Sequence, residues 1–255
     1  MTDEFKDPVS LAGKRILVTG ASSGIGRQTA IACAEMGAQM VITGRNAERL
    51  SHTLQVLAGA GHQSVTADLT VEEERAALAK NAGALHGVVH AAGISKLVPL
   101  RMLKQAHLDE MFHHNTYAPL LLTKELLAKR SLQAGGSIVF ISAVASHIGP
   151  LASSAYSASK GALLGAMRSL GLEVAKQGIR ANCIAPGYVR TPMLDGLASG
   201  GVDTEEYANL APLGMGEPQD VALAAVFYLS DASRWMTRNY FVIDGGLTVP
   251  MDVFA

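Results

Sequence analysis

A tyrosine and a lysine four residues apart, Tyr156 and Lys160, are the residues of this sequence best suited to acid–base chemistry. Side chains at this spacing lie on the same face of a helix. Tyrosine titrates near pH 10 and is a poor base at neutral pH. An ammonium about 4 Å away would contribute roughly 4 kcal/mol, which is about three pKa units at most. The pair could therefore act as a general acid and base, although the spacing alone also arises by chance on many helices.

Short apolar strands alternate with helical stretches along the chain. Strands are predicted at residues 15–19, 39–43, 63–67, 87–91, 136–142 and 179–185, and helices near residues 24–36, 46–58, 71–82 and 99–113. A further helix carries Tyr156 and Lys160. This alternation indicates a parallel sheet covered by helices on both faces. No linker divides the chain, so we expect one α/β domain over residues 1–255, with a core at about residues 11–249.

Composition excludes several partner classes. Hydrophobic residues make up 49% of the chain, and the net charge of −1 gives no basic surface for nucleic acid. No window reaches the roughly 18 apolar residues of a membrane helix, and the first residues lack a signal-peptide run. Cys33 and Cys183 match no metal spacing and are expected to be buried thiols in a reducing compartment. We therefore expect a soluble cytoplasmic protein without a metal site.

A glycine-rich loop, "TGASSGIGR", lies between the first predicted strand and helix. Glycines permit a tight turn and close backbone approach, and the following helix N-terminus offers free N–H groups to a pyrophosphate. A glycine-rich turn that binds nothing is the alternative, but the strand–helix context favours a dinucleotide. The expected contacts come from Gly20, Ser22, Ser23, Gly24, Ile25 and Gly26.

The end of the second strand bears on which nicotinamide cofactor binds. NAD-binding sheets usually place an acidic side chain there to bind the ribose 2′-hydroxyl. This chain has Gly44 and then Arg45, with no acid before Glu48. A guanidinium suits a 2′-phosphate. The sequence thus predicts NADP(H) rather than NAD(H), although Arg45 could also be an ordinary solvated charge.

Together these motifs resemble the short-chain dehydrogenase/reductase family, and within it the NADP-dependent 3-oxoacyl-ACP reductases. The resemblance runs from about Leu11 to Val249 and rests on "TGASSGIG", "ADLT", "HAAG", Asn115, "YSASK", "APGYVRTPM" and "VIDGG". It implies a single Rossmann-type doubly wound domain with a seven-stranded parallel sheet. It also implies an NAD(P)-dependent oxidoreductase that interconverts a carbonyl and a secondary alcohol, and a homotetramer or homodimer that pairs helices 115–131 and 154–177.

The resemblance assigns roles to matching residues. Tyr156 would protonate the carbonyl oxygen, Lys160 would lower the tyrosine pKa and bind the nicotinamide ribose, and Asn115 would hold a water in the proton relay. Asn115 could instead cap a helix over residues 115–129, and Asp68 could open a turn. The remaining implied cofactor contacts are Asp68 and Leu69 at the adenine, Ala92 and Gly93 at the adenosine ribose, and Pro186, Gly187, Val189 and Thr191 at the nicotinamide.

One position departs from the family pattern. The family usually has a catalytic serine thirteen residues before the tyrosine, and here that residue is Ala143. Such a donor is typically worth about 10²–10³ in rate. Ser142, through a local bulge, and Ser153 or Ser154 from the following loop are candidate substitutes. The substrate pocket is expected to include Ala143, His147 and Tyr188, whereas His113 and His114 are expected in helix packing.

Three readings of function follow. The first is an NADP(H)-dependent enzyme acting on a moderately apolar ketone or secondary alcohol, with a lid at about residues 190–215. The second, kept open by Ala143, is a weakened or inactive member, natural or engineered, that binds the cofactor as a sensor. The third, a sugar-nucleotide epimerase or dehydratase, usually needs a longer C-terminal substrate domain than this chain provides.

Overall fold

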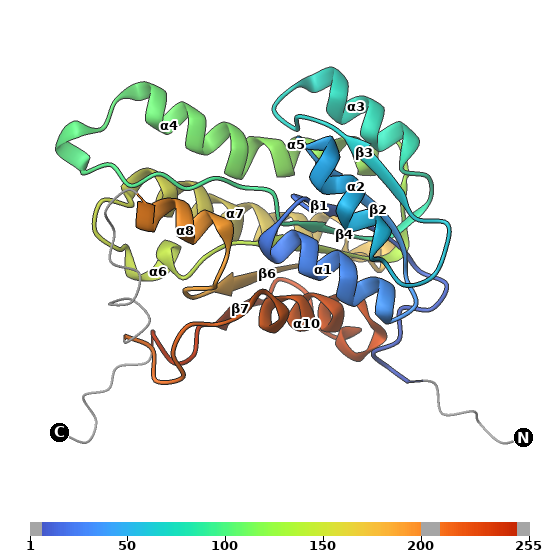
Figure 1. Ribbon diagram of the computed structural model, residues 1–255. Helices are drawn as coiled ribbons and strands as arrows, with labels where there is room; N and C mark the ends of the chain where they lie inside the picture. The colour runs from blue at the N-terminus through green and yellow to red at the C-terminus, as the bar shows by residue number, and fades with distance from the viewer. Residues whose placement is uncertain (1–6, 200–209, 249–255) are drawn as a thin grey trace, which may run out of the picture.

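The computed structural model describes residues 7–199 and 210–248. These residues form one seven-stranded sheet with the strand order β3-β2-β1-β4-β5-β6-β7 (Figure 1). The strands are β1 (Arg15–Thr19), β2 (Gln39–Gly44), β3 (Gln63–Thr66), β4 (Leu85–His90), β5 (Leu132–Ile141), β6 (Arg180–Pro186) and β7 (Tyr240–Ile243). Every neighbouring pair is parallel. The predicted doubly wound parallel α/β fold is confirmed.

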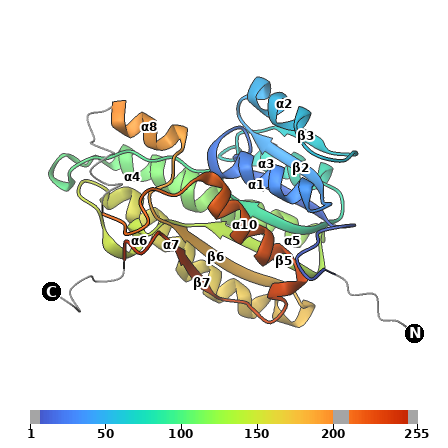
Figure 2. The same ribbon diagram turned by 60° about the horizontal axis from the view of Figure 1, so that its bottom comes forward.

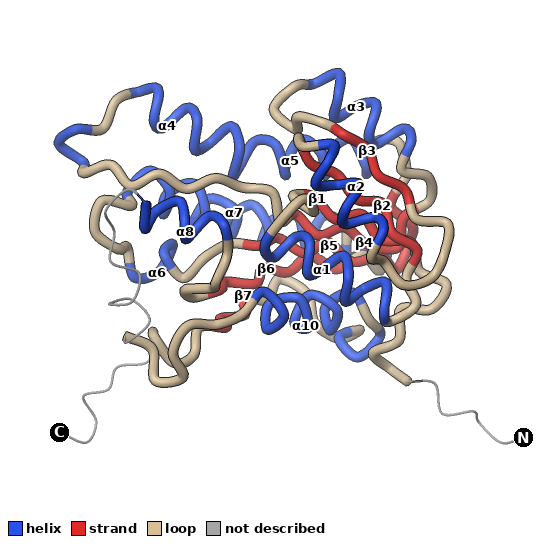
Figure 3. Tube along the Cα trace, in the orientation of Figure 1, coloured by secondary structure: helices blue, strands red, loops and turns tan. Residues whose placement is uncertain are grey.

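Helices cover both faces of the sheet. One face carries α1 (Gly24–Glu35) and α10 (Pro218–Leu229), and the other carries α3 (Glu72–Asn81), α5 (Ala118–Ala128) and α7 (Ser154–Glu173). Figure 2 shows α10 in front of the sheet, and Figure 3 shows the strands between the two layers. The other helices are α2 (Ala47–Gln55), α4 (Gln105–Phe112), α6 (Ala145–Ile148) and α8 (Pro192–Ser199), with short η1 (Leu100–Met102), η2 (His113–Tyr117), η3 (Ala175–Gln177) and η4 (Asp231–Ser233).

Burial on both sides explains the continuously apolar strands. Ile16 and Val18 of β1 pack in the core beneath α1 and α10, whereas Leu17 packs in the core beneath α3, α5 and α7. Successive side chains of a strand point to opposite faces, so a strand covered on both faces needs apolar residues throughout. All seven residues of β6 are buried as well, and its polar Arg180 and Asn182 make hydrogen bonds to Ser233 and Met236.

The helix around Asn115 differs from the prediction. It begins at Gln105 rather than at Asn115, because α4, η2 and α5 follow one another without a break. The intermediate η2 has π-helical geometry, and Asn115 is its central residue. Asn115 therefore does not cap a helix. Single π turns inside α-helices occur often at functional sites, because they turn a side chain out of the regular 3.6-residue pattern.

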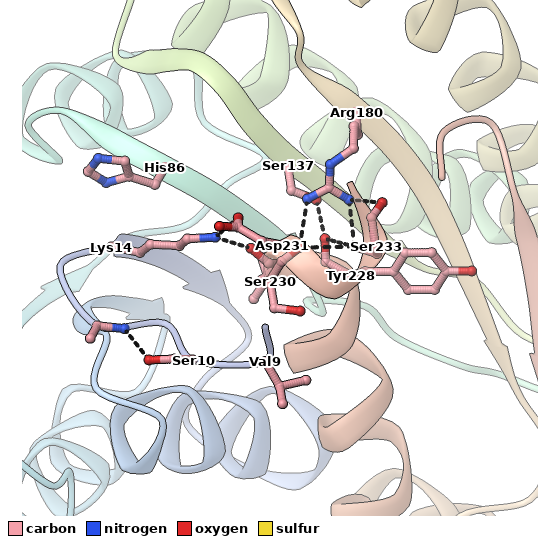
Figure 4. A network of polar contacts seen from close by, with 12 residues as sticks. Val9, Ser10, Lys14, His86, Ser137, Arg180, Tyr228, Ser230, Asp231 and Ser233 are labelled. Carbon is pink, nitrogen blue, oxygen red and sulfur yellow. Dashed lines mark hydrogen bonds and ion pairs between the residues drawn. The ribbon is translucent and has the colours of Figure 1, made fainter. Parts of the chain in front are cut away.

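A polar network ties η4 to the amino-terminal end of the sheet (Figure 4). The buried Arg180 donates from Nη1 to the hydroxyl of Ser233 at 2.7 Å and from Nη2 to the carbonyl of Ser230 at 3.3 Å. Lys14, just before β1, pairs with Asp231 at 2.7 Å. The bonds from Arg180 to Ser233 and Ser230 compensate the desolvation of its buried guanidinium. The network holds the end of the sheet opposite the cavities described next.

Candidate active site

Two cavities lie at the carboxyl ends of the strands. The larger cavity, of about 530 Å³, is lined by Thr19, Gly44 and His90, the last residues of β1, β2 and β4. The smaller cavity, of about 150 Å³, is lined by Ile141 and Pro186, the last residues of β5 and β6. Because the chain order reverses between the neighbours β1 and β4, the larger cavity lies at the switch point where open α/β sheets bind ligands.

The glycine loop shapes one wall of the larger cavity. Gly20 has a φ of +68°, and a Cβ there would lie 2.8 Å from Cα of Ala92. A Cβ on Gly26 would collide with the carbonyl oxygen of Gly20. Ser23 precedes α1 without a side-chain cap, so the N–H groups of the first turn keep no capping partner. This cradle fits an anionic group such as a pyrophosphate. The predicted loop residues Gly20, Ser22, Ser23, Gly24, Ile25 and Gly26 all line the cavity.

Cationic side chains stand at the end of β2. Arg45 is exposed and lines the larger cavity, and Arg49 lines it one helical turn later. Asn46 caps α2 by accepting the N–H of Arg49 at 2.8 Å. The hydroxyl of Ser22 lies 3.2 Å from the place of a Cβ on Gly44. The donor set fits a phosphate. Sequence reasoning missed Arg49, although its spacing of four from Arg45 would have signalled it.

The opposite wall holds the residues expected near the adenine. Asp68, Leu69, Ala92 and Gly93 all line the larger cavity. The carboxylate of Asp68 accepts bonds from the N–H and hydroxyl of Thr70 at 2.9 and 2.7 Å, so Asp68 also opens a turn. Burial raises the pKa of Asp68, but the bonds from Thr70 and the charge of Arg45 outweigh it and lower that pKa. His114, which was expected in helix packing, lies in η2 and lines the cavity as well.

His90 is a buried neutral histidine at the base of this cavity. The hydroxyl of Thr123 donates to the carbonyl of Pro119 at 2.8 Å, so Nε2 of His90 must donate to that hydroxyl, also at 2.8 Å. Its Nδ1 has no hydrogen-bond partner among the residues that the structure describes. Burial lowers the pKa of His90 to about 3, because the charged ring would lose its hydration.

Replacing His90 with asparagine should weaken the acid sensitivity of the fold. An unfolded histidine titrates near pH 6.5, so between about pH 6.5 and 3 the unfolded chain binds a proton that the folded chain does not. The free energy of unfolding therefore decreases as the pH is lowered through this range, by up to about 1.4 kcal/mol per pH unit for this residue. Urea unfolding at pH 7 and pH 5 should show the native chain losing about 2 kcal/mol more than His90→Asn. Equal losses in the two proteins would contradict this account.

Tyr156 and Lys160 both line the smaller cavity. Nζ of Lys160 donates to the carbonyl of Ile141 at 2.8 Å. Burial raises the pKa of Tyr156 to about 12 and lowers the pKa of Lys160 to about 8. The expected lowering of the tyrosine pKa is absent, because desolvation disfavours the charged form of each group and the ammonium is directed at a carbonyl. Other predicted residues of this cavity are Ala143, Pro186, Gly187, Tyr188, Val189 and Thr191.

Asn115 connects the loop after β4 to α7. Its Oδ1 accepts the N–H of Ile94 at 2.9 Å, and its Nδ2 donates to the carbonyl of Ile94 and the hydroxyl of Ser159, each at 3.0 Å. A Cβ on Gly93 would lie 3.0 Å from Oδ1 of Asn115 and 3.2 Å from Nζ of Lys160. Only glycine leaves room for this approach. The expected water-holding role of Asn115 stays a prediction.

Ser142 does not take the place of the missing serine. The N–H groups of Ser142 and Val144 bond to the carbonyls of Ile184 and Pro186 at 2.8 and 3.0 Å, so the parallel bonding to β6 continues past Ile141 without a bulge, and the backbone turns to α-helical geometry at Val144. The hydroxyl of Ser142 donates to the backbone carbonyl of Lys160 at 3.0 Å. Ser142 was one of three candidate substitutes and needed a local bulge, which is absent because β6 bonds to this segment as far as Val144.

The loop candidates are also displaced from the cavity. Ser153 is buried, donates to the carbonyl of Pro150 and shares a 2.8 Å bond with Ser157, and Ser154 is exposed. His147 stacks on Tyr240 with ring centroids 5.7 Å apart. Ser153, Ser154 and His147 are not among the lining residues of either cavity, so their expected contact with substrate is not found.

Part of the predicted lid is helical. Residues 192–199 form α8, whose Met193, Leu194 and Leu197 line the smaller cavity. Residues 200–209 of the lid and Val249 of the predicted core lie outside the described residues. The sequence predicted the lid segment but did not indicate that Met193, Leu194 and Leu197 would line the cavity.

Within residues 7–199 and 210–248, no cluster of His, Cys, Asp or Glu could hold a metal ion. No helix in that part of the chain is long and apolar enough to cross a membrane. Cys33 and Cys183 are buried free thiols, as predicted, and burial raises the pKa of each to about 12. A thiol held protonated in this way is a poor nucleophile and metal ligand.

Comparison with known proteins agrees with this geometry. A family model described as "Enoyl-(Acyl carrier protein) reductase" matches residues 20–248. Carbonyl reductase family member 4 of Danio rerio is 36% identical over 240 residues, covering 92% of this chain and 98% of the relative. The 3-oxoacyl-(acyl-carrier-protein) reductase of Mus musculus is 36% identical over 235 residues, covering 90% and 96%.

Solved structures show the same likeness. A short-chain type dehydrogenase/reductase from Mycobacterium ulcerans matches with a TM-score of 0.86 and 31% identity, covering 93% of this chain and 90% of that chain. An Agrobacterium tumefaciens protein solved with bound NADP has a TM-score of 0.86 and 28% identity, covering 96% and 100%. Fold, cavities and relatives together define an NAD(P)-dependent oxidoreductase. The chain belongs to the short-chain dehydrogenase/reductase family.

Proposed function

We propose that this chain interconverts a moderately apolar ketone and its secondary alcohol with NADP(H), using Tyr156 as the acid and base. One observation carries the proposal. The smaller cavity, which holds Tyr156 and Lys160, adjoins the larger cavity that fits a dinucleotide. The two share the lining residues Ile25, Ala91, Gly93, Thr191 and Met193. A substrate beside Tyr156 would therefore lie next to the inner end of the cofactor site.

The protonation state of Tyr156 suits reduction. Bound NADPH would supply a hydride to the carbonyl carbon. The phenol of Tyr156, with a pKa of about 12, is protonated at neutral pH and can donate its proton to the carbonyl oxygen. Lys160, held by the carbonyl of Ile141, would bind the nicotinamide ribose and replenish that proton.

The apolar character of the substrate follows from the smaller cavity. Besides Tyr156 and Lys160, its walls are formed mainly by the apolar side chains Val144, Pro150, Met193, Leu194 and Leu197. A cavity of about 150 Å³ accommodates a small group around the reacting carbonyl. The carbonyl reductase and 3-oxoacyl reductase names of the relatives support a carbonyl substrate.

The two reaction directions should differ in pH dependence. Reduction uses protonated Tyr156, whereas oxidation needs the phenolate, which the raised pKa makes scarce at neutral pH. We therefore expect kcat/KM for oxidation to rise from about pH 7 to 10, by up to about tenfold per unit, while reduction stays level. Steady-state rates with a matched ketone and alcohol pair test this. An oxidation plateau below about pH 8 would indicate that the tyrosine pKa is lowered after all.

Ala143 favours a second candidate function, a cofactor-binding sensor with little or no turnover. Ala143 lines the smaller cavity with no hydroxyl of its own. A panel of ketones and aldehydes with NADPH, with the alcohol product identified, distinguishes the two candidates. Product formed at a rate proportional to enzyme supports the reductase. Tight NADPH binding with no product from any panel member contradicts it and favours the sensor.

The homotetramer and the cytoplasmic location stay predictions. Exposed apolar side chains are consistent with helix pairing between subunits. Tyr117 and Leu121 lie four residues apart at η2 and α5 and are 47% and 40% exposed, and Leu172 of α7 is 61% exposed. Side chains at this spacing share a helix face, so they could be covered by a second copy.

A further inference from the structure

Ser95 stands out among the hydroxyls of the smaller cavity. The lining residues of this cavity include Ser95, Ser142 and Thr191. Ser142 bonds to the carbonyl of Lys160, and Thr191 bonds to the carbonyl of Val189 at 3.3 Å. Of these three side chains, Ser95 alone has a hydroxyl without a hydrogen bond within residues 7–199 and 210–248. Such a hydroxyl is available to a bound molecule.

The backbone that carries Ser95 is held rigidly. Asn115 bonds to both the N–H and the carbonyl of Ile94, so the residue before Ser95 is clamped on both sides. Gly93, two residues before Ser95, lies against the ammonium of Lys160. A donor held on a fixed backbone needs little reorganisation during the reaction. The chain therefore presents Ser95 from a fixed segment beside the proton-transfer pair.

Ser95 and Ala143 follow neighbouring strands. Ser95 comes five residues after the end of β4, and Ala143 comes two residues after the end of β5. β4 and β5 pair in parallel, with His90 opposite Phe140 near their ends. Both residues reach the same cavity from adjacent strands. A hydroxyl at Ser95 can thus address the substrate carbonyl from the β4 side, whereas the usual serine would do so from the β5 side.

We propose that Ser95 donates the hydrogen bond that polarises the substrate carbonyl, in place of the serine that Ala143 replaces. The inference rests on the proposed carbonyl reduction. As the hydride adds to the carbonyl carbon, negative charge grows on the oxygen, which Ser95 stabilises and Tyr156 protonates. No covalent bond changes at Ser95. The alcohol and the oxidised cofactor are the only products.

The main test compares Ser95→Ala, Ser95→Thr, Ala143→Ser and the double variant Ser95→Ala/Ala143→Ser. Loss of the donor should lower kcat/KM for ketone reduction by about 10²–10³. Ser95→Thr keeps a hydroxyl and should retain most activity, and the double variant should regain it through the hydroxyl at position 143. The NADPH dissociation constant, from fluorescence titration, should stay unchanged in all four. The matched control is Ser154→Ala, because Ser154 is exposed and lines neither cavity.

A binding measurement tests the same contact without turnover. An amide isosteric with the best ketone presents a carbonyl acceptor that is not reduced. Its dissociation constant from the enzyme–NADP⁺ complex, measured by calorimetry, should rise about threefold to tenfold in Ser95→Ala, as expected for one neutral hydrogen bond. Ser95→Thr should bind the amide nearly as well as the native chain.

The outcomes separate the inference from the proposed function. Native activity that survives in Ser95→Ala overturns the role of Ser95 and leaves the reductase standing. A native chain without activity, combined with an active Ala143→Ser variant, also overturns that role, since the native site then lacks a donor. No product from any variant, with NADPH still bound, overturns the proposed function and the inference with it.

Discussion

Replacing Tyr156 with phenylalanine should reduce carbonyl reduction by about 10²–10⁴, the usual contribution of a positioned general acid. The variant keeps the aromatic ring and loses only the hydroxyl, so the packing of α7 should persist. The ammonium of Lys160 is held by the carbonyl of Ile141, so we expect it to replace the phenol only poorly as the proton donor to the substrate. Steady-state kcat with NADPH and the best ketone measures the loss.

A matched control separates chemistry from structure in this experiment. Tyr117→Phe removes a hydroxyl from an exposed tyrosine that lines neither cavity, and it should keep full activity. NADPH affinity should stay within about twofold in both variants, because neither tyrosine belongs to the glycine loop before α1 that is proposed to bind the phosphates. A Tyr156→Phe variant with kcat within about tenfold of the native chain would contradict the assignment and point to a different proton donor.

Local sequence patterns predicted the layered architecture well but element ends less well. Apolar runs placed six strands in order, because burial on both faces leaves a signature that needs no partner to be recognised. β5 was predicted to begin at residue 136 and begins at Leu132 instead. Its early part pairs Leu132 with Leu85 across a register shift, and Gly135 has a φ of +78°. That pairing depends on a distant strand, so periodicity within the segment did not reveal it.

In the candidate site, too, features set by local sequence were predicted, and features set by packing between elements were not. Every predicted cofactor contact lines one of the two cavities, because the glycine loop and strand ends are set by local backbone requirements. The choice among the serines depended on packing between elements. Ser142 is unavailable because its hydroxyl bonds to α7, and Ser95 was overlooked because no spacing ties it to Tyr156. The tyrosine pKa was misjudged for a related reason, since charge pairing was counted and desolvation was not.

The π turn around Asn115 is a further feature that the sequence concealed. Residues 105–128 carry an ordinary helical pattern, so the prediction divided them at a potential cap. In the structure the extra residue in the turn directs Asn115 toward Ile94 and Ser159. The bonds of Asn115 make the loop after β4 rigid, and that rigidity gives Ser95 a defined position. A side chain expected to serve the proton relay thus also organises the substrate end of the site.

Exchanging the residues at the end of β2 should reverse the cofactor preference. Arg45→Ala removes a guanidinium from the larger cavity and should weaken NADPH binding about tenfold to a hundredfold, the value of one charge-assisted hydrogen bond. Gly44→Asp adds an acceptor for the ribose hydroxyls of NADH and repels a 2′-phosphate. Its Cβ would lie 3.2 Å from the hydroxyl of Ser22, which can rotate away. In the double variant, the NADPH-to-NADH preference should fall by about 10³ or more.

Fluorescence titration of both cofactors measures this change directly and does not depend on turnover. Arg101→Ala is the matched control, because Arg101 is exposed on η1 and lines neither cavity. It should leave both dissociation constants unchanged. Raising the salt concentration should weaken NADPH binding more in the native chain than in Arg45→Ala, because an exposed guanidinium–phosphate pair is screened. Native binding of NADH tighter than NADPH, or an Arg45→Ala variant with unchanged NADPH affinity, would show that Arg45 is an ordinary solvated charge and that cofactor choice lies elsewhere in the cavity.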